Sequence, residues 1–296
     1  MLYKYVSLAR RSILEDGLIR FSQPSVFNDP FDLNPCFSLM ADEDFYDLED
    51  GSGKEGKFLP SARQDALDLM LKTMAPGIQA EARRYAGLPG TYSLRPNDIA
   101  RSTLDAMYGV LSLTDSPNNL LMWAHYADSH NGFVLQFDDQ HEFFAPKTLA
   151  GVEFGVTKIN YSDQRPILSH RSIKSPDVLY RKSPEWDYEN ESRLVRALEE
   201  ADQIIDASPF PIALFRVPFE AIKGVIIGVA VSHEDRVRLF ELLGTPERKH
   251  ITIFQTRLSD ESYQLEIHPP LDGKVDQGAL NGRVLPPNIN LSITIQ

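Results

Sequence analysis

Short apolar segments of strand length recur along the chain and constrain its fold more than any other feature. Each has four to six residues, and runs this short favour strands, because helices usually need about ten residues or more. The predicted strands are Leu2–Val6, Leu18–Ser22, Gly109–Thr114, Gly132–Phe137, Val156–Tyr161, Leu214–Val217, Gly224–Gly228, Ile251–Thr256 and Tyr263–Ile267. We therefore expect one α+β domain, residues 1–296, built around a largely antiparallel sheet.

Helices are predicted where a capping residue precedes a helical run. Ser7 and Ser232 are expected to cap helices that end near Asp16 and Leu243, and a glycine follows each of them. A third, short helix is expected over Leu120–Ala127.

Residues 41–107 lack clear strand patterns. Within them, Ala62–Met74 and Ile78–Ala86 have helical patterns, and Gly51–Lys57 forms a flexible break. We expect a helical insertion over residues 41–107 that covers one side of the core.

Composition favours a cytoplasmic protein without a membrane-spanning segment. No run approaches the roughly 18 apolar residues that a spanning helix needs, and a single cysteine excludes an internal disulfide and a Cys-rich zinc site. The net charge of −12 disfavours broad attraction to nucleic acid or anionic membranes. It leaves room for a local basic groove, since Lys4, Arg10, Arg11 and Arg20 make the first twenty residues basic.

Acidic and basic residues alternate around Glu191. Glu189, Glu191 and Arg193 lie two positions apart, so in an extended strand they would share one face. Two carboxylates and a guanidinium on one face suit the stabilisation of a cation or the binding of ribose hydroxyls. The same spacing also fits a solvated strand face with a ladder of charges.

Two further segments carry residue types that occur in binding sites. The turn Asn28-Asp29-Pro30, flanked by aromatic residues, fits either a structural turn or a loop that cups a ligand. Trp123 and Tyr126 flank His125, which could act as a general base or could be a structural histidine.

No metal site is predicted. His125 and His130 are five positions apart, which is unsuitable for a shared site on one helix, and no HExxH motif is present. A serine nucleophile also lacks its usual GxSxG setting.

Four blocks stand in order along the chain: LYKYVSL, FSQPSVFNDPFD, LSLTDSPNNLLMWAHYADSHNGFVLQFD and YRKSPEWDYENESRLV. Taken together, they resemble the bacterial family called domain of unknown function 2971. The family name carries no function.

The order of these elements also resembles the ADP-ribosyltransferase fold, which has a split, mostly antiparallel sheet. Lys4 stands where that fold has a His or Arg on its first strand, and Ser22 and Ser25 fall in its second motif. Glu189 and Glu191 resemble its paired glutamates, of which the second is catalytic.

This resemblance implies NAD as substrate, with no metal. A carboxylate near the ribose would stabilise the positive charge that builds up when the nicotinamide–ribose bond breaks. Lys4 or Arg193 would offset the pyrophosphate charge. The residues implied to surround the nicotinamide and the pocket are Tyr5, Phe21, Phe27, Asn28, Asp29, Trp123, His125 and Tyr126.

The leading interpretation is an ADP-ribosyltransferase-like enzyme of the toxin or phage-defence type. Its acceptor would be a protein, a nucleic acid or a small molecule, and a partner protein could neutralise it. One alternative is a non-catalytic nucleotide-binding or regulatory module. Another is a nuclease that uses His125 and the glutamates.

Overall fold

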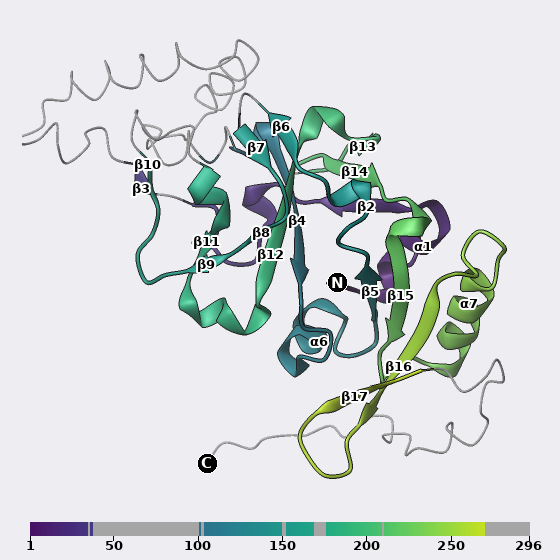
Figure 1. Ribbon diagram of the computed structural model, residues 1–296. Helices are drawn as coiled ribbons and strands as arrows, with labels where there is room; N and C mark the ends of the chain where they lie inside the picture. Colours follow the sequence, from purple (N-terminus) through teal and green to yellow (C-terminus); the bar gives the residue numbers. More distant parts are fainter. Residues whose placement is uncertain are drawn as a thin grey trace, which may run out of the picture.

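The computed structural model describes residues 1–34, 36–37, 101, 104–149, 152–168, 176–208 and 210–269 (Figure 1). The predicted insertion over residues 41–107 lies outside these ranges apart from residues 101 and 104–107, which are helical. Its expected helices Ala62–Met74 and Ile78–Ala86 therefore lie outside the described residues.

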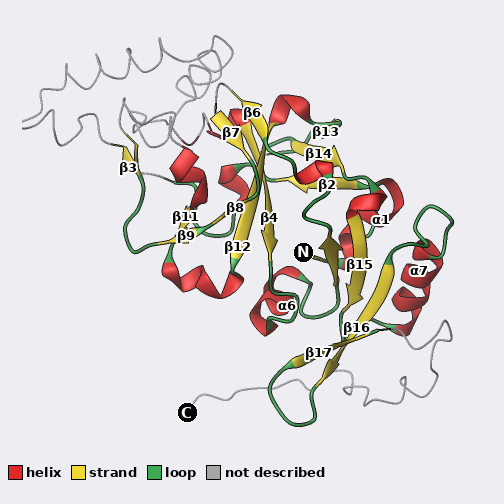
Figure 2. Cartoon of the chain, in the orientation of Figure 1, coloured by secondary structure: helices red, strands yellow, loops and turns green. Residues whose placement is uncertain are grey.

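Eight strands form one large sheet, around which the helices are short (Figure 2). From one edge to the other they are β17 (Leu265–His268), β16 (Thr252–Leu258), β15 (Ile222–Ile227), β5 (Phe133–Phe137), β1 (Leu2–Val6), β4 (Tyr108–Thr114), β12 (Glu191–Ala197) and β8 (Thr157–Lys158). Neighbouring strands are antiparallel, except that β15 and β16 are parallel. The predicted α+β class with a large, mostly antiparallel sheet is confirmed.

The remaining strands form smaller sheets. One has three strands in the order β13 (Gln203–Ile205), β14 (Ile212–Arg216) and β2 (Leu18–Phe21). The two-stranded sheets pair β3 (Cys36–Phe37) with β10 (Ile167–Leu168), β9 (Asn160–Tyr161) with β11 (Arg181–Lys182), and β6 (Lys147–Leu149) with β7 (Val152–Phe154).

The helices pack against both faces of the large sheet. Apart from the helical residues 101 and 104–107, the α-helices in the described part of the chain are α1 (Ile13–Asp16), α6 (Leu120–Tyr126) and α7 (His233–Leu243). The 3-10 helices are η1 (Leu8–Arg10), η2 (Pro24–Val26), η3 (Glu142–Phe144), η4 (Pro176–Tyr180), η5 (Pro184–Glu189), η6 (Leu198–Glu200) and η7 (Phe219–Ala221). Leu239 of α7 joins the largest core cluster, whereas Trp123 of α6 joins a separate cluster.

Strand β1 lies in the middle of the sheet and is apolar on both faces. Leu2 and Val6 belong to the same core cluster as α7, and Tyr5 belongs to the cluster with α6. Because side chains alternate along a strand, Lys4 shares the face of Leu2 and Val6. Its cross-strand partner is Leu135, which is fully buried, so a lysine occupies a position that suits an apolar residue.

The large sheet is split between β1 and β4. The two strands, both fully described, pair at a single position, Tyr3–Thr114. At the other end of β4, Val110 instead forms an isolated bridge with Ser22, which follows β2. Strand β4 therefore has one complete edge, along β12, and one edge that is largely open.

Most predicted elements match, and the mismatches have physical causes. The helix expected from Ser7 is divided into η1 and α1, and Ser7 makes no side-chain cap. Leu8 and Ile13 are five positions apart, which puts them about 140° apart on a continuous helix. The break lets both of them reach the core. Gly17 ends α1 with φ 72°, as predicted.

The segment Val156–Tyr161 was predicted as one strand and is two. Strand β8 pairs with β12, whereas β9 pairs with β11. The two halves of the segment therefore belong to different sheets. The helix after Ser232 agrees with the prediction: the Ser232 hydroxyl accepts the Asp235 N–H at 3.1 Å, and α7 ends before Gly244.

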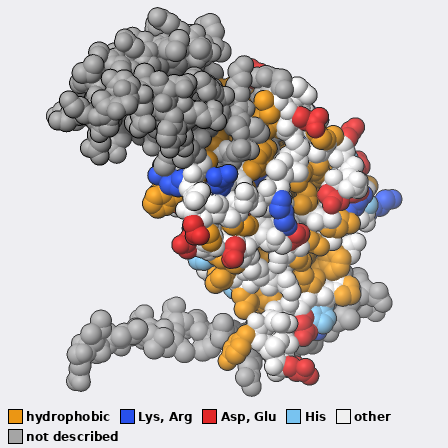
Figure 3. All heavy atoms as spheres, turned by 60° about the vertical axis from the view of Figure 1, so that its left-hand side comes forward, with side chains coloured by type: hydrophobic (Ala, Val, Ile, Leu, Met, Phe, Trp, Pro, Cys, Tyr) orange, Lys and Arg blue, Asp and Glu red, His pale blue; other side chains and the backbone are white. Residues whose placement is uncertain are grey.

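Charges are mixed on the described part of the face in Figure 3, where acidic and basic side chains lie among hydrophobic ones. The net charge of −12 is thus not gathered into one acidic patch there. Within the described residues, no helix combines the length and the apolar character needed to cross a membrane.

Candidate functional site

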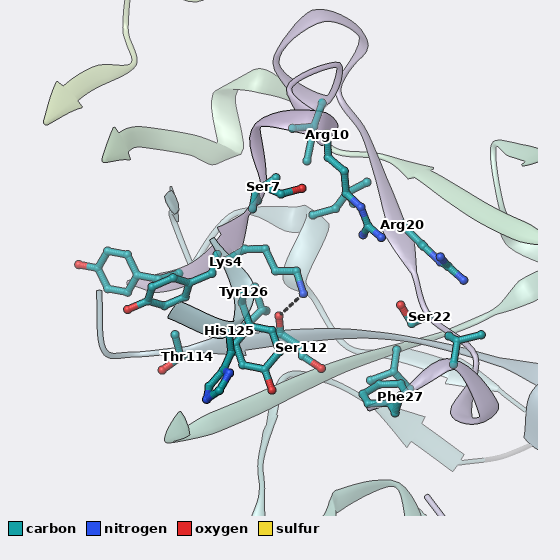
Figure 4. A pocket seen from close by; sticks show the side chains of 18 of the residues that line it. Lys4, Ser7, Arg10, Arg20, Ser22, Phe27, Ser112, Thr114, His125 and Tyr126 are labelled. Carbon is teal, nitrogen blue, oxygen red and sulfur yellow. Dashed lines mark hydrogen bonds between the residues drawn. The ribbon is translucent and has the colours of Figure 1, made fainter. Parts of the chain in front are cut away.

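A cavity of about 740 Å³ opens where β1 and β4 separate. Its walls come from β1, η1, α1 and β2, and from η2 and the turn after it. They also come from β4, α6, β11, the end of η5, the start of β12, and β13 and β14. Segments far apart in the sequence, from Tyr3 to Leu214, therefore meet around one space (Figure 4).

Nine of the predicted site residues line this pocket, although their chemical roles stay predictions. They are Lys4, Tyr5, Ser22, Phe27, Asn28, His125, Tyr126, Glu189 and Glu191. The first strand, the Asn28 turn and Glu191 thus converge, as the resemblance in motif order implies.

Five other predicted site residues lie outside the pocket lining, and each is held elsewhere. Phe21 is fully buried against Phe215, Trp123 is fully buried in the core, and Ser25 donates its hydroxyl proton to Asp105 at 2.5 Å. The others are Asp29 and Arg193, which are also buried. The structure therefore places these five side chains outside the pocket wall, and their predicted contact with a nucleotide stays a prediction.

Strand β12 begins at Glu191 and places it beside Arg193. Arg193 Nε donates to Glu191 Oε1 at 2.8 Å, and Nη2 donates to Oε2 at 3.1 Å. The two residues share a strand face, as predicted. Glu189 does not: it ends η5, and Asn190 turns the chain with φ 46° before the strand starts.

Lys182 brings the two glutamates together. From β11, its ammonium group donates to Glu189 Oε2 and, at 3.1 Å, to Glu191 Oε2. Only 3% of Glu189, 3% of Glu191 and none of Arg193 is exposed. The alternative of a solvated ladder of charges is therefore wrong for these residues.

Asp32, from the turn after Asn28-Asp29-Pro30, completes the group. Its Oδ2 accepts from Arg193 Nη2 at 2.6 Å and lies 3.8 Å from Lys182 Nζ. We call the five residues Asp32, Lys182, Glu189, Glu191 and Arg193 the buried ionic cluster. Three carboxylates face two cations, which leaves a formal charge of −1 beside the pocket.

Glu191 is ionised at neutral pH, whereas burial raises the pKa of Asp32. Burial alone would raise the pKa of Glu191, but the Arg193 guanidinium and the Lys182 ammonium outweigh it and lower the pKa to about 2. Burial likewise opposes the charged form of Lys182, and the carboxylates of Glu191 and Glu189 nonetheless raise its pKa. Glu191 therefore presents a permanent negative charge.

Tyr126 links the cluster to helix α6 and to the Asn28 turn. Its hydroxyl donates to Glu189 Oε1 at 2.5 Å and accepts from Asn28 Nδ2 at 3.2 Å. The helix is fixed at its start by Asn119, whose side chain accepts two backbone N–H groups. It is fixed further along by Trp123, which packs edge-on against Tyr5 at 5.4 Å.

An unusual turn follows α6 and brings another carboxylate to the pocket. Asp128, Ser129 and His130 all have positive φ, of 50°, 52° and 68°. Such a conformation is strained for residues other than glycine. Asp128 lines the pocket, as does His125, which is exposed.

Lys4 lies at the split itself. Its Nζ donates to the Ser112 carbonyl oxygen at 3.0 Å and so spans the gap between β1 and β4 (Figure 4). Burial lowers the pKa of Lys4 from 10.5 to about 8. The amino group is therefore neutral in a substantial fraction of molecules slightly above neutral pH.

Several lining residues were not predicted from the sequence. Arg10 and Arg20 appeared only in the basic composition of the first twenty residues, and Lys182 only within the YRKSPEWDYENESRLV block. A lysine inside that conspicuous charged segment was a usable signal. Ser7 was expected to cap a helix, but its hydroxyl lines the pocket.

Within the described ranges, no group of three or more His, Cys, Asp and Glu residues could hold a metal ion.

The family described as "Protein of unknown function (DUF2971)" matches residues 122–194, from α6 into β12. This confirms the identification of that family made from the sequence. Searches of curated proteins and of solved structures gave no match. The matched segment contains His125, Tyr126, Lys182, Glu189, Glu191 and Arg193, which form one side of the site.

Proposed function

We propose that this chain is an ADP-ribosyltransferase-like enzyme, which cleaves the nicotinamide–ribose bond of NAD and transfers ADP-ribose to a protein or nucleic-acid acceptor. The observation that carries the proposal is the position of Glu191. It is an ionised carboxylate at the start of β12, in the wall of a pocket where the sheet splits, opposite residues of β1.

The reaction needs a negative charge beside the ribose. As the C–N bond breaks, its electron pair moves to the nicotinamide nitrogen, and positive charge develops on the ribose C1 and ring oxygen. The acceptor then forms a bond to C1 and releases a proton. The buried ionic cluster, with its formal charge of −1, would favour this cation without having to reorganise.

Aromatic rings border the same space. Phe27 lines the pocket, and the Arg193 guanidinium lies 5.3 Å from its ring centre on the cluster side. Tyr126 also lines it, with its hydroxyl fixed by Glu189. In this proposal Phe27 and Tyr126 contact the nicotinamide ring, whereas Phe21 does not, since it is buried in the core.

Lys4 is the proposed partner of the pyrophosphate. Its amino group lies in the pocket and makes one hydrogen bond, to a neutral carbonyl oxygen. Arg193 is unsuited to that role, because its guanidinium is enclosed by Asp32, Glu191 and the Leu179 carbonyl.

A second candidate is a non-catalytic nucleotide-binding or regulatory module. It is favoured by the engagement of both Glu191 oxygens, since Arg193 and Lys182 already bind them. A carboxylate held in this way is well placed to organise a pocket even where no bond is broken.

Release of nicotinamide from NAD tests the proposal. The wild type should release nicotinamide, and Glu191→Gln should lower the rate on the order of a hundred- to thousandfold, because the swap removes charge and keeps shape. NAD binding should survive in the variant. Equal rates in wild type and variant would refute the mechanism, and NAD binding without turnover in the wild type would favour the module.

A further inference from the structure

Three cations that are not part of the buried ionic cluster line the pocket. Lys4 comes from β1, Arg10 from η1 and Arg20 from β2, and all three line the pocket. Figure 4 shows the Arg10 and Arg20 side chains on the same side of this space, with Lys4 reaching towards Ser112. The proposed cleavage step assigns no role to either arginine.

The ion pairs of the described residues do not include these cations. Within the described residues, none of the three forms an ion pair with a carboxylate. Arg20 Nε is buried and has no hydrogen-bond partner there. The carboxylate of Asp16 also lines this side, but its Oδ1 accepts the Leu18 N–H at 2.8 Å.

Two hydroxyl groups lie beside the cations. Ser7 and Ser12 line the pocket, and each precedes a helix. Neither side chain caps its helix, although serine at such positions usually does. Their hydroxyl groups are therefore available to donate to a ligand.

Clustered like charges are unfavourable. Burial, and after it the charge of Arg10, oppose the charged form of Arg20. For Lys4, burial outweighs the favourable charge of Glu191, and Arg10 again opposes the charged form. A bound anion would relieve this repulsion. Guanidinium groups suit phosphate best, because their fixed N–H groups match its oxygens in pairs.

We propose that Lys4, Arg10 and Arg20, together with the hydroxyl groups of Ser7 and Ser12, form a binding site for the diphosphate of a nucleotide. Three cations from three segments match two linked phosphate groups better than one carboxylate. The identity of the nucleotide rests on the proposed function, whereas the anion site can be tested without turnover.

ADP, adenosine and inorganic pyrophosphate are the probes, with affinity measured by calorimetry. ADP should bind more tightly than adenosine, and pyrophosphate should compete with it. Arg20→Gln should weaken ADP binding roughly ten- to a hundredfold, the effect of losing one charged hydrogen bond, and leave adenosine unchanged. Arg20→Lys should restore part of the affinity.

Arg216→Gln is the matched control. Arg216 lies on β14, which pairs with β2, but it points to the Asp16 carbonyl and does not line the pocket. It should leave ADP affinity unchanged, and melting curves of all variants exclude misfolding as the cause. Equal affinities of wild type for ADP and adenosine, or an Arg20→Gln variant with normal ADP affinity, would overturn the inference.

Proton uptake gives an independent readout. Lys4 faces the cations Arg10 and Lys182 and the carboxylates Glu189 and Glu191. An added phosphate should raise the pKa of Lys4 from about 8. Near pH 8, binding should then take up as much as about half a proton per site, seen as a dependence of the binding heat on buffer. Lys4→Met should abolish the uptake, and a wild type without uptake would contradict the role of Lys4.

The outcomes for the two proposals can be told apart. If Arg20→Gln weakens ADP binding but the wild type releases no nicotinamide from NAD, the anion-site proposal stands and the transferase proposal is refuted. If the protein turns over NAD but Arg20→Gln leaves its ADP affinity unchanged, the transferase proposal stands and the anion site is refuted.

Discussion

Asp32 and Arg193 are 161 positions apart in sequence, yet their Oδ2 and Nη2 atoms are 2.6 Å apart in a fully buried ion pair. This contact ties the turn after Asn28 to strand β12. Because Arg193 also holds both oxygens of Glu191, the turn fixes the direction of the carboxylate that faces the pocket. Side chains that never meet a ligand thus set the geometry of the site.

The two partners of this pair should differ in their effect on stability. Arg193→Met leaves three carboxylates facing Lys182 alone and should lower the free energy of unfolding by roughly 3–5 kcal/mol. Asp32→Asn leaves two carboxylates and two cations and should cost only about 1–3 kcal/mol. Urea unfolding measures the free energy of unfolding of each variant and so shows which of the two is less stable.

Asp139→Asn is a suitable control for the first prediction. Asp139 pairs with the chain's N-terminal amine at the surface, at 2.9 Å, so its loss should change stability by less than about 1 kcal/mol. A larger cost for Asp32→Asn than for Arg193→Met would contradict the charge count of the cluster.

The two glutamates should divide the reaction between them. Glu189→Gln should reduce transfer to an acceptor more than hydrolysis of NAD, because in the fold that the chain resembles the first glutamate faces the acceptor. The Tyr126 hydroxyl can still donate to the new amide oxygen, so the pocket should keep its shape. Parallel assays of ADP-ribosylated product and free nicotinamide measure the split, and equal losses in both would speak against it.

His125 should matter for binding and little for folding. It lines the pocket and is exposed, so His125→Ala should weaken ligand binding or turnover while the melting temperature changes little. By contrast, Trp123→Phe on the same helix should lower the melting temperature, because Trp123 is fully buried. A melting temperature that falls as far for His125→Ala would show a structural role instead.

Stability should depend on Lys4 in a pH-dependent way. Its pKa falls from 10.5 to about 8 on folding, so below pH 8 the folded protein carries an unfavourable buried charge. Between these values the unfolded chain binds more protons, and stability from this group rises with pH. Lys4→Met should therefore raise the free energy of unfolding by roughly 3 kcal/mol near pH 7, with the difference vanishing above pH 10.5.

Lys223→Met controls for the loss of a lysine as such. Lys223 pairs with Asp138 at the surface at 3.3 Å, so its effect should not share this pH dependence. A Lys4→Met effect that stays constant from neutral to alkaline pH would contradict the buried-charge explanation.

Local patterns were sufficient for much of the fold. Strand Leu2–Val6 and the helix between Ser232 and Gly244 follow from apolar runs and caps that act over a few residues. The prediction of one continuous helix over residues 7–16 was wrong, because Leu8 and Ile13 are both buried in the core and would not lie on the same side of such a helix. The prediction of one strand over residues 156–161 was wrong, because these residues pair with two different strands. A local sequence pattern does not show which strands will pair.

The site was predictable where motif order was informative. Lys4, Asn28 and Glu191 do line one pocket, but Arg193 turned inward because Asp32, far away in sequence, pairs with it. Burial of the charged segment also depends on Lys182, whose strand pairing brings it under both glutamates. The spacing of charged residues in the sequence does not predict such long-range charge pairing.

The single backbone pairing between β1 and β4 gives the sheet an uneven protection against hydrogen exchange. Val110 donates its N–H to Ser22, so the Ser112 N–H, two residues on, points to the same open edge. Its exchange with deuterium should be faster than that of neighbouring amides paired with β12. Any molecule that occupies the gap should slow it, so one backbone amide can report occupancy before the ligand's chemistry is known.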